Sequence, residues 1–437
     1  MSFLASERLP GAALLATGVA LAAFSLALGH AGLPLRPWIA VVMWGSVAVG
    51  VVVTLSLAMF GRRSLSGSLL TATVVLAIAS RLLLVGGPHD LSDDSIRYQW
   101  DGRVLAHGIN PYAYAPEDPQ LASLRTETPG LVINHSSLHT VYPPLAQGLF
   151  AVAHLVSPRS LIGLQVMTLL AELLSWLLLA RMLVQEGLPR SRLLLAAWLP
   201  LVLLESYRPG HVDTLTLPFV ALGVRSVERR QPIRAGVFLA LATLIKPYPL
   251  LMVPAALREF GWRGSARFLS AIAAFVVLGY LPFVHAGHWL FDSMWLMAST
   301  WSFNGSLAPL LGAVLPAPWA RLAAGMLMFG LVGAATRWGA SFRERALLAV
   351  AAFVACTPTL YPWYLVWALP LLVLEPDPAL LSVMLLAPLS YVVLIGWHEQ
   401  GAWSLPAWVG AAEYVPFYFL VVRGAWRRHG MFRRRVA

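Results

Sequence analysis

The acid pair Asp93 and Asp94 opens the stretch of the chain whose residue types and spacing are best suited to catalysis. On a helix, Asp93, Arg97 and Asp101 recur every four residues and share one face. An arginine between two acids can keep a carboxylate ionised, so that the carboxylate accepts a proton as a general base. The helix is expected to end near Gly108, because glycine is typical just after a helix C-terminus. An exposed, salt-bridged loop helix would show the same spacing, so both interpretations stay open on these residues alone.

Two further segments contain cations that could bind a phosphate. Lys246 is the only lysine among 31 basic residues, and it lies in apolar surroundings within a Lys-Pro-Tyr-Pro sequence. A lysine at membrane depth is a functional-site hypothesis, and its compact charge suits a phosphate. Arg208, close to His211 and Asp213, is a second candidate phosphate ligand. The alternatives are a lysine that reaches the membrane surface and a His211/Asp213 pair that only orients helices.

Aromatic residues cluster in two later segments, around Asn304 and around Trp363. Aromatic rings at a membrane surface usually form an interfacial belt, but they can also stack on a sugar or clamp a polyprenyl chain. Tyr142 precedes two prolines, which can begin a helix. All three segments are therefore candidate substrate contacts beside their purely structural interpretation.

The composition indicates an integral membrane protein. Of the 437 residues, 58% are hydrophobic and only 12% are charged, against about 25% charged in a typical soluble domain. The net charge of +11 comes from arginines clustered between apolar runs, which predicts contact with membrane lipids and not with nucleic acid. The single cysteine, Cys356, excludes a disulfide within the chain and a cysteine metal site.

Apolar runs predict membrane spans near 11–29, 38–59 and 68–86. The arginines between the second and third runs are expected in the cytoplasm, because basic loops stay on that side. Segment 87–142, called the acidic loop below, then lies outside and contains seven of the 20 acidic residues. An acidic loop of this size is unusual for a mere connector.

Two stretches do not fit a simple alternation of spans. Residues 143–157 are apolar but short, and a crossing there would put later arginines outside, so we expect a helix in the outer interface. Residues 235–257 have arginine clusters on both sides, and two prolines near Lys246 break helical hydrogen bonding. We expect two half-helices that meet near Lys246, as is tolerated where broken helices are buried or line a cavity.

The chain is expected to form one all-α polytopic membrane domain over residues 1–437, with about 12–14 crossings. Within it we distinguish an N-terminal helical hairpin, 1–67, and an outer catalytic loop, 87–158, that carries helices next to the membrane. Both termini are expected in the cytoplasm of a multi-pass plasma (inner) membrane protein whose active site faces outside.

The order of these segments resembles that of GT-C membrane glycosyltransferases, and most closely that of the prokaryotic polyprenyl-phosphate-mannose-dependent (GT87-like) mannosyltransferases. The likeness spans roughly residues 92–367. It is carried by Asp93-Asp94 with Arg97-Tyr98, Trp100-Asp101-Gly102-Arg103, Gly108-x-Asn110-Pro111-Tyr112, Tyr142-Pro143-Pro144-Leu145, Gly210-His211-x-Asp213, Lys246-Pro247-Tyr248-Pro249, Phe303-Asn304-Gly305-Ser306 and Tyr361-Pro362-Trp363-Tyr364.

The resemblance implies a GT-C fold and an inverting transfer of a hexose, with mannose the first candidate. The donor would be a polyprenyl-phosphate sugar, and the acceptor a lipid-linked or cell-envelope glycan. An aspartate of the first outer loop would be the base, which favours Asp93, the first acid of the pair, with Asp94 beside it. The sugar, the acceptor and the metal requirement stay open, and no cofactor is required by the residues, although a divalent cation could bridge the pair.

Other residues receive expected roles from the same reasoning. Contacts with the donor phosphate are expected at Lys246, Arg208 and Arg97. Contacts with the substrates are expected at Tyr98, Asp101, Asn110, Tyr112, Tyr142, His211, Asp213, Asn304 and Trp363.

One feature departs from the family pattern, because two predicted spans precede the one that leads into the acidic loop, whereas the GT-C core usually has one. Either the N-terminus carries an extra hairpin or the count of spans differs. Two other classes of function compete: a secondary transporter, and a protein that binds or ligates lipid-linked glycans. The chain shows no internal symmetry and concentrates acids in one loop, which argues against a transporter.

Overall fold

The computed structural model describes residues 2–29, 32–60, 67–127 and 132–436. In this part of the chain the structure is helical, and the β-type pairing consists of two isolated bridges that join Phe303 and Asn304 to Thr359. Five helices are long and apolar enough to cross a membrane, and six shorter apolar helices accompany them. The predicted class, an all-α polytopic membrane protein, is confirmed. The five long helices cover Leu35–Ser56, Ile162–Gln185, Trp262–Leu290, Ala317–Trp338 and Pro378–Gln400.

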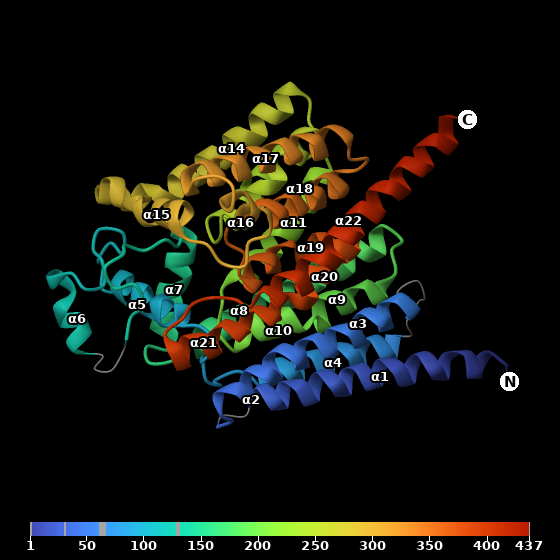
Figure 1. Cartoon of the computed structure of the whole chain (residues 1–437), viewed down its shortest axis with the longest axis horizontal. Helices are drawn as coiled ribbons and strands as arrows, with labels where there is room; N and C mark the ends of the chain where they lie inside the picture. Colours follow the sequence, from blue (N-terminus) through green and yellow to red (C-terminus); the bar gives the residue numbers. More distant parts are fainter. Residues whose placement is uncertain (1, 30–31, 61–66, 128–131, 437) are drawn as a thin grey trace.

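The N-terminal helices match the first three predicted spans. Helix α1 (Ser2–Gly29) packs against α3 (Ser46–Phe60) and α4 (Gly67–Leu82), and α2 (Leu35–Ala40) runs into α3 through the π-helical turn η1 (Val41–Gly45). These four helices lie together along one side of the molecule (Figure 1). The arginine-containing connection 61–66, used to orient the chain, lies outside the described residues. The expected hairpin therefore corresponds to a group of neighbouring helices.

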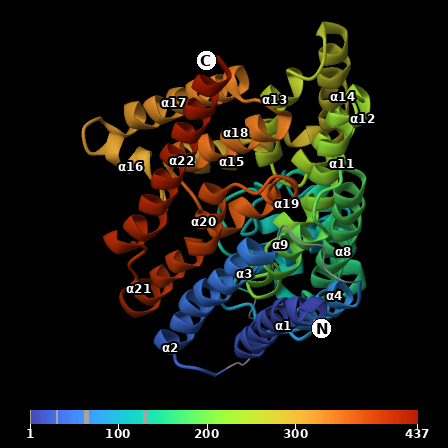
Figure 2. The same ribbon diagram turned by 90° about the vertical axis from the view of Figure 1, so that its right-hand side faces the viewer.

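The core contains three short helices whose residues are all buried. They are α9 (Leu193–Trp198), α10 (Pro200–Tyr207) and α19 (Leu369–Leu374). In Figure 2, α9 and α19 lie between the N-terminal helices and the pair α12 and α14. These segments are apolar around their whole circumference, as expected for helices without a lipid-facing side. Ionisable groups that occur here, such as Glu205, must therefore find partners inside the protein.

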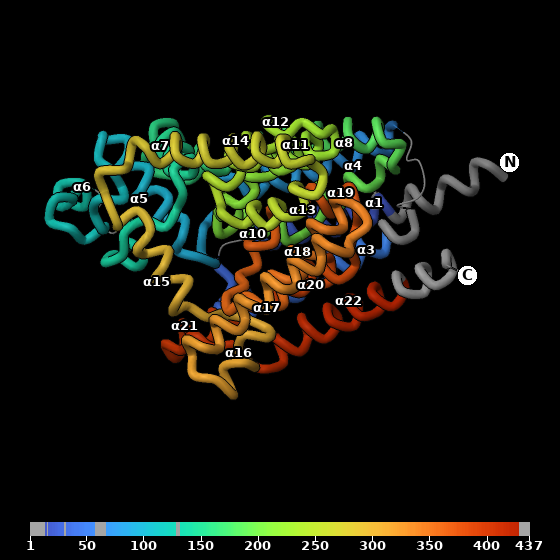
Figure 3. The backbone as a smooth tube through the Cα atoms, turned by 90° about the horizontal axis from the view of Figure 1, so that it is seen from above, coloured from blue at the N-terminus to red at the C-terminus, as the bar shows by residue number. Residues whose placement is uncertain are grey.

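The acidic loop folds into helices at one end of the molecule. Figures 1 and 3 both show α5 (Asp94–Ala106), α6 (Ala122–Thr126) and α7 (Pro144–Val156) gathered there, with α15 (Asp292–Thr300) at the same end. Helix α5 packs on α7 at Gly102, where any Cβ would collide with the carbonyl oxygen of Phe150. Helix α7 has 13 residues, which is about 20 Å, shorter than a membrane's apolar core.

The helix expected to break near Lys246 is broken. Helix α12 (Pro232–Thr243) ends before it, and the chain resumes as η5 (Tyr248–Met252) and α13 (Val253–Leu257). Proline rings prevent a continuous hydrogen-bond ladder here. The carbonyl of Leu244 is free to accept hydrogen bonds from the backbone N–H groups of residues 145 and 146, at 3.0 and 3.1 Å. The break therefore fastens Lys246 to the start of α7.

The remaining elements complete the chain. They are η2 (Pro119–Leu121), α8 (Ile162–Gln185), η3 (Arg190–Arg192), η4 (Asp213–Thr216), α11 (Leu217–Glu228), α14 (Trp262–Tyr280), η6 (Leu281–Leu290), α16 (Leu307–Gly312), α17 (Ala317–Trp338), α18 (Phe342–Cys356), η7 (Pro362–Ala368), α20 (Pro378–Leu386), η8 (Ala387–Val392), α21 (Val393–Gln400) and α22 (Ala407–Val436).

Candidate active site

The acid pair lies at the N-terminus of α5, where Asp93 is the capping residue and Asp94 begins the helix. The backbone N–H of Asp94 donates to Ser92 Oγ at 3.2 Å. At the other end, Gly108 has a φ of +75°, so the predicted end of the helix near Gly108 is confirmed. Backbone N–H groups and the helix dipole favour negative charge at an N-terminus, so the position of the pair favours ionised carboxylates.

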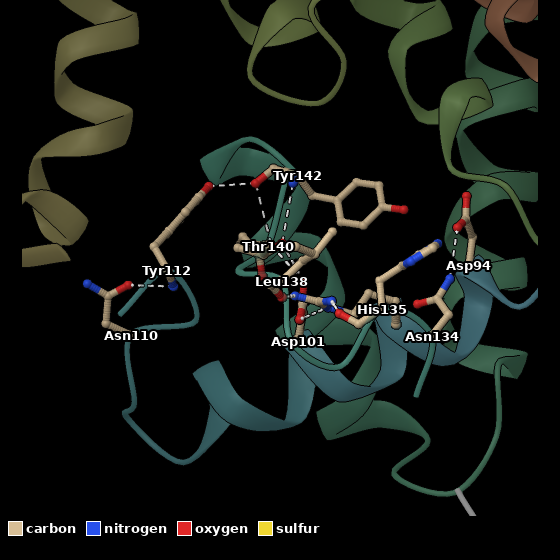
Figure 4. A network of polar contacts seen from close by, with 11 residues as sticks. Asp94, Asp101, Asn110, Tyr112, Asn134, His135, Leu138, Thr140 and Tyr142 are labelled. Atoms are coloured by element: carbon tan, nitrogen blue, oxygen red, sulfur yellow. Dashed lines mark hydrogen bonds and ion pairs between the residues drawn. The ribbon is translucent and has the colours of Figure 1, made fainter. Parts of the chain in front are cut away.

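An asparagine joins the two acids. Asn134 Nδ2 donates to Asp93 Oδ1 at 3.0 Å and to Asp94 Oδ1 at 3.3 Å, and Figure 4 shows Asn134 beside Asp94. Asp93 is exposed, whereas the side chain of Asp94 is 26% exposed. Burial raises the pKa of Asp94, Lys246 opposes this rise, and Asp93 adds to it. The two acids of the pair therefore occupy different environments.

Arg97 does not pair with Asp93, which corrects the expectation that it keeps Asp93 ionised. Its Nε donates to Asp101 Oδ1 at 2.9 Å, and its Nη2 donates to the carbonyl of Leu138 at 2.8 Å. Thr140 Oγ1 donates to the other oxygen of Asp101 at 2.5 Å. Arg97 and Asp101 are both buried, so this network holds residues 138–140 of the acidic loop against α5. The geometry gives no support to a donor-phosphate contact by Arg97 or a substrate contact by Asp101.

The other predicted substrate contacts in the acidic loop also belong to its framework. Figure 4 shows Asn110 and Tyr112 at the end of the network opposite to Asp94. Asn110 Oδ1 accepts from the N–H of Tyr112 at 3.0 Å, and Tyr112 Oη donates to the carbonyl of Tyr142 at 2.6 Å. Tyr98 is buried, with its ring stacked on Phe150 at a centroid distance of 4.8 Å. None of these four predicted residues lines the pocket described next.

A pocket of about 250 Å³ opens beside Asp93. Its walls come from the start of the acidic loop, from Phe303, from residues 361–363 and from the chain around η8 and α21. Phe303, Tyr361 and Trp363 form a column of stacked rings, with successive centroids 4.6 and 4.5 Å apart. An apolar aromatic wall next to a carboxylate suits a sugar, whose C–H faces stack on rings and whose hydroxyls need polar partners.

The column of rings ends on His211, whose ring stacks on Trp363 at 3.7 Å. His211 Nδ1 lies 2.9 Å from Glu205 Oε2, and His211 Nε2 lies 3.8 Å from Asp94 Oδ2. Tyr391 Oη donates to Glu205 at 2.9 Å. Burial lowers the pKa of His211 well below its usual value, and Lys246 and His89 act in the same direction. His211 therefore lies between two carboxyl groups, in surroundings that disfavour its charged form.

Lys246 contacts an acid of the segment that contains His211. Its Nζ is 3.3 Å from Asp213 Oδ2 and 5.4 Å from the centre of the Tyr142 ring. Asp213 is therefore a partner for Lys246. Burial raises the pKa of Asp213 to about 6, although Lys246 opposes this rise. We call Asp94, Glu205, His211, Asp213 and Lys246 the site cluster.

Arg208 and Lys246 have different partners. It makes two hydrogen bonds with Asp90, at 2.9 and 2.8 Å, and its guanidinium lies 4.4 Å from the centre of the Trp38 ring. Arg208 is buried, but Asp90 is part of the pocket wall. Arg208 thus supports the wall through Asp90, and Arg208 and Lys246, two of the three predicted phosphate ligands, bind different acids.

Asn304 and Trp363, the two later predictions, differ in position. Trp363 lines the pocket and touches His211. Asn304 has a φ of +50° and donates through Nδ2 to Glu413 Oε2 at 2.8 Å, so its amide is held by α22. The neighbouring Phe303 is the residue of this segment that reaches the pocket.

Several residues of this region were not found from the sequence. Glu205 gives a usable signal, since an acid inside an apolar run is a functional-site hypothesis. Asn134, Tyr391 and Glu413 give none, because polar residues of these types are common in loops and helices. In the described part of the chain no group of three or more His, Cys, Asp or Glu side chains could hold a metal ion. A cation bridging the acid pair therefore stays a prediction.

Comparison with known families adds independent information. The model described as Glycosyltransferase family 87 matches residues 140–362, just over half of the 437-residue chain. The matched segment contains Lys246 and His211, whereas Asp93 and Asp94 precede it. No curated protein matches the chain.

Proposed function

The chain belongs to glycosyltransferase family 87, and from this premise we propose that it transfers mannose from a polyprenyl-phosphate carrier to a lipid-linked or cell-envelope glycan. The protein is a membrane glycosyltransferase by family and by fold class. The carrier, the sugar, the acceptor and the roles of individual residues are our proposal. A donor with a long isoprenoid tail is consistent with an enzyme that is itself embedded in the bilayer.

The observation that carries the proposal is the exposed carboxylate of Asp93 on the wall of an aromatic pocket. In the proposed reaction the acceptor hydroxyl oxygen attacks the anomeric carbon while its proton passes to Asp93. The bond from that carbon to the phosphate oxygen breaks, and polyprenyl phosphate leaves with the bonding electrons. Attack opposite to the leaving group inverts the anomeric configuration. A positioned general base contributes a factor of about 10² to 10⁴ in rate.

Charge on the leaving phosphate needs a cation that is largely shielded from water. Lys246 is 7% exposed, and its ammonium is held only 3.3 Å from Asp213 Oδ2. We propose that the donor phosphate approaches Lys246 from the side of the acid pair. Stabilising charge as it develops is commonly the largest electrostatic contribution to catalysis. Phe303, Tyr361 and Trp363 would then face the sugar and the first isoprene units.

The proposal is tested by incubating the purified full-length protein with radiolabelled polyprenyl-phosphate mannose and an extract of membrane glycolipids. We expect labelled glycolipid from this donor and none from a nucleotide sugar, and the product should have the opposite anomeric configuration. Polyprenyl-phosphate glucose is the matched donor control for the sugar. Hydrolysis or transfer from nucleotide sugars alone would contradict the proposed donor. Movement of intact donor across proteoliposomes without transfer would instead support a transporter.

The proposed orientation has its own test, since the acidic loop should lie outside and the arginine-rich connections inside. Ser123 in the acidic loop and Arg190 in an arginine-rich connection are both exposed, so single cysteines are introduced at these two positions. In a Cys356→Ala background, a membrane-impermeant maleimide added to intact cells should label residue 123 and not residue 190. Labelling of both positions from the same side would overturn the orientation.

A further inference from the structure

Behind the pocket wall, a chain of polar contacts leads from Tyr391 to Asp94. Tyr391 Oη donates to both oxygens of Glu205, at 3.1 and 2.9 Å. Glu205 Oε2 lies 2.9 Å from His211 Nδ1, and His211 Nε2 faces Asp94 Oδ2 at 3.8 Å. The four residues come from η8, α10, the turn before η4 and α5. Packing of separate elements therefore creates this chain, which no local pattern requires.

The chain of polar contacts continues through Asn134 to Asp93, the acid that lines the pocket. The Nδ2 group of Asn134 donates to one oxygen of Asp94 and to one oxygen of Asp93. The two acids are therefore linked by one amide, and a displacement of Asp94 removes one of the two contacts that hold this amide. Because Asp93 is exposed, its carboxylate has few other constraints on its direction.

His211 is held more tightly than Asp94, one of the two acids that it faces. The ring is 1% exposed and is stacked on Trp363 with an angle of 19° between the ring planes. The stack fixes the plane of the ring, and Glu205 fixes the direction of Nδ1, so Nε2 must point toward Asp94. Nε2 is a buried atom that has no hydrogen-bond partner among the described residues. A buried polar atom without a partner is unfavourable, which favours its use by Asp94 or by a bound substrate.

We propose that His211, held by Glu205 and Tyr391, is a positioning residue that orients Asp94 and, through Asn134, the base Asp93. This inference rests on the proposed transfer reaction. A neutral imidazole carries one N–H, so it donates to one carboxyl group and accepts from the other. When both contacts close, either Glu205 or Asp94 holds a proton, and the other carboxyl group accepts the imidazole N–H. Lys246, His89 and Asp93 are the other charged or titratable groups that influence this arrangement.

The wall of the pocket contacts both Glu205 and His211. Tyr391 and Trp363 line the pocket, and one of them holds Glu205 while the other stacks on His211. A substrate that packs on these two side chains would press on the groups that fix the histidine. A role confined to bracing α10 against η8 predicts a different result, namely loss of stability with unchanged turnover of the folded protein.

A double-mutant cycle separates the two roles. Glu205→Gln keeps the size of the side chain and touches neither Asp94 nor the proposed donor site directly. We expect kcat to fall on the order of tenfold, with KM for the donor within about twofold, and we expect less than about twofold further loss in an Asp94→Asn background. His211→Gln should retain more activity than His211→Ala, because glutamine can still bond to a carboxyl group. An equal loss from Glu205→Gln in both backgrounds, or a change in KM alone, would overturn the proposal.

A second measurement does not depend on activity. ¹⁵N-histidine spectra of the full chain in detergent identify the His211 signals by their loss in His211→Gln. Asp94→Asn should shift these signals, whereas Glu117→Gln, on an exposed acid of the same loop, should not. Unshifted His211 signals in Asp94→Asn would refute the contact, whatever the kinetics. A shift in a protein that transfers sugar from no polyprenyl-phosphate donor would support the contact and refute only the proposed function.

Discussion

Two sets of buried charges in this protein differ in how they are compensated. Arg81 and Glu172, called the membrane pair here, are both 0% exposed, with Nε and Oε2 2.5 Å apart. Arg81 also donates to the carbonyl of Ala197 at 2.8 Å and lies 4.8 Å from the centre of the Trp176 ring. Neither residue of the pair lines the pocket.

The site cluster is arranged more loosely. Lys246 and Asp213 are 3.3 Å apart, and His211 and Asp94 are 3.8 Å apart, both longer than the contact within the membrane pair. Trp363 and Tyr391 connect this cluster to the pocket. A buried charge needs a partner in either case, but a tight pair suits helix packing whereas a loose one can exchange its partner for a substrate. The distance within a buried pair, and its access to a pocket, thus separate the two uses.

The largest expected effect is at Asp93, which lines the pocket next to Asp94 of the site cluster. Asp93→Asn keeps the size and the acceptor oxygen that Asn134 uses, but it removes the base. Turnover should fall by a factor on the order of 10² to 10⁴, with little change in donor binding or thermal stability. Initial rates with labelled donor measure this loss, and Glu117→Gln provides the control on the same loop. Near-normal turnover would remove Asp93 from the mechanism, and a loss confined to Asp94→Asn would move the base by one residue.

Substitutions in the membrane pair should lower the stability of the protein and leave its turnover unchanged. Arg81→Met leaves Glu172 buried and uncompensated, which should lower the free energy of unfolding by about 3–5 kcal/mol. Turnover of the remaining folded protein should stay within about twofold, because the pair lies outside the pocket. Thermal unfolding in detergent and rates per folded molecule check both parts. The double variant Arg81→Met/Glu172→Leu should recover most of the stability, and a large loss of turnover in it would contradict the comparison.

A smaller effect is expected at Lys246. Lys246→Met should weaken donor binding by about 1.5–3 kcal/mol, the size of a charge-assisted hydrogen bond. The single change also leaves Asp213 without its cation, so Lys246→Met/Asp213→Asn is the matched variant that keeps the site neutral. Binding of a polyprenyl phosphate, measured by the quenching of tryptophan fluorescence, should be weak in both variants. Normal affinity in the double variant would exclude Lys246 from the donor site.

The smallest effect concerns pH. Burial raises the pKa of Asp213 to about 6, above the value of about 3.9 expected in the unfolded chain. The folded state then binds the extra proton between these values, so this group's contribution to stability is present at low pH and is lost as pH rises through about 6. The thermal midpoint of Asp213→Asn should therefore fall less than that of the wild type between about pH 4 and 7. Parallel curves would contradict the raised pKa.

Local features of the sequence were enough for several parts of the structure. The end of α5 just before Gly108 and the break around Lys246 depend on glycine and proline, whose backbone limits act within a few residues. The membrane class depends on the length and hydropathy of single apolar runs, which are also local quantities. The acid pair was found for the same reason, since Asp93 and Asp94 are neighbours at a helix start.

Tertiary structure determined the hydrogen-bond and ion-pair partners of the polar side chains. Arg97 had Asp93 and Asp101 available at equal spacing. The later part of the acidic loop selected Asp101 by adding Leu138 and Thr140 to the network. Glu205 and Tyr391 are 186 residues apart, and Asn304 and Glu413 are 109 apart. Such contacts depend on which helices pack together, because a polar side chain removed from water must bond to whatever polar group the packing brings to it. The sequence therefore determined the elements and the acid at the pocket, whereas helix packing determined which charges hold the fold and which face the site.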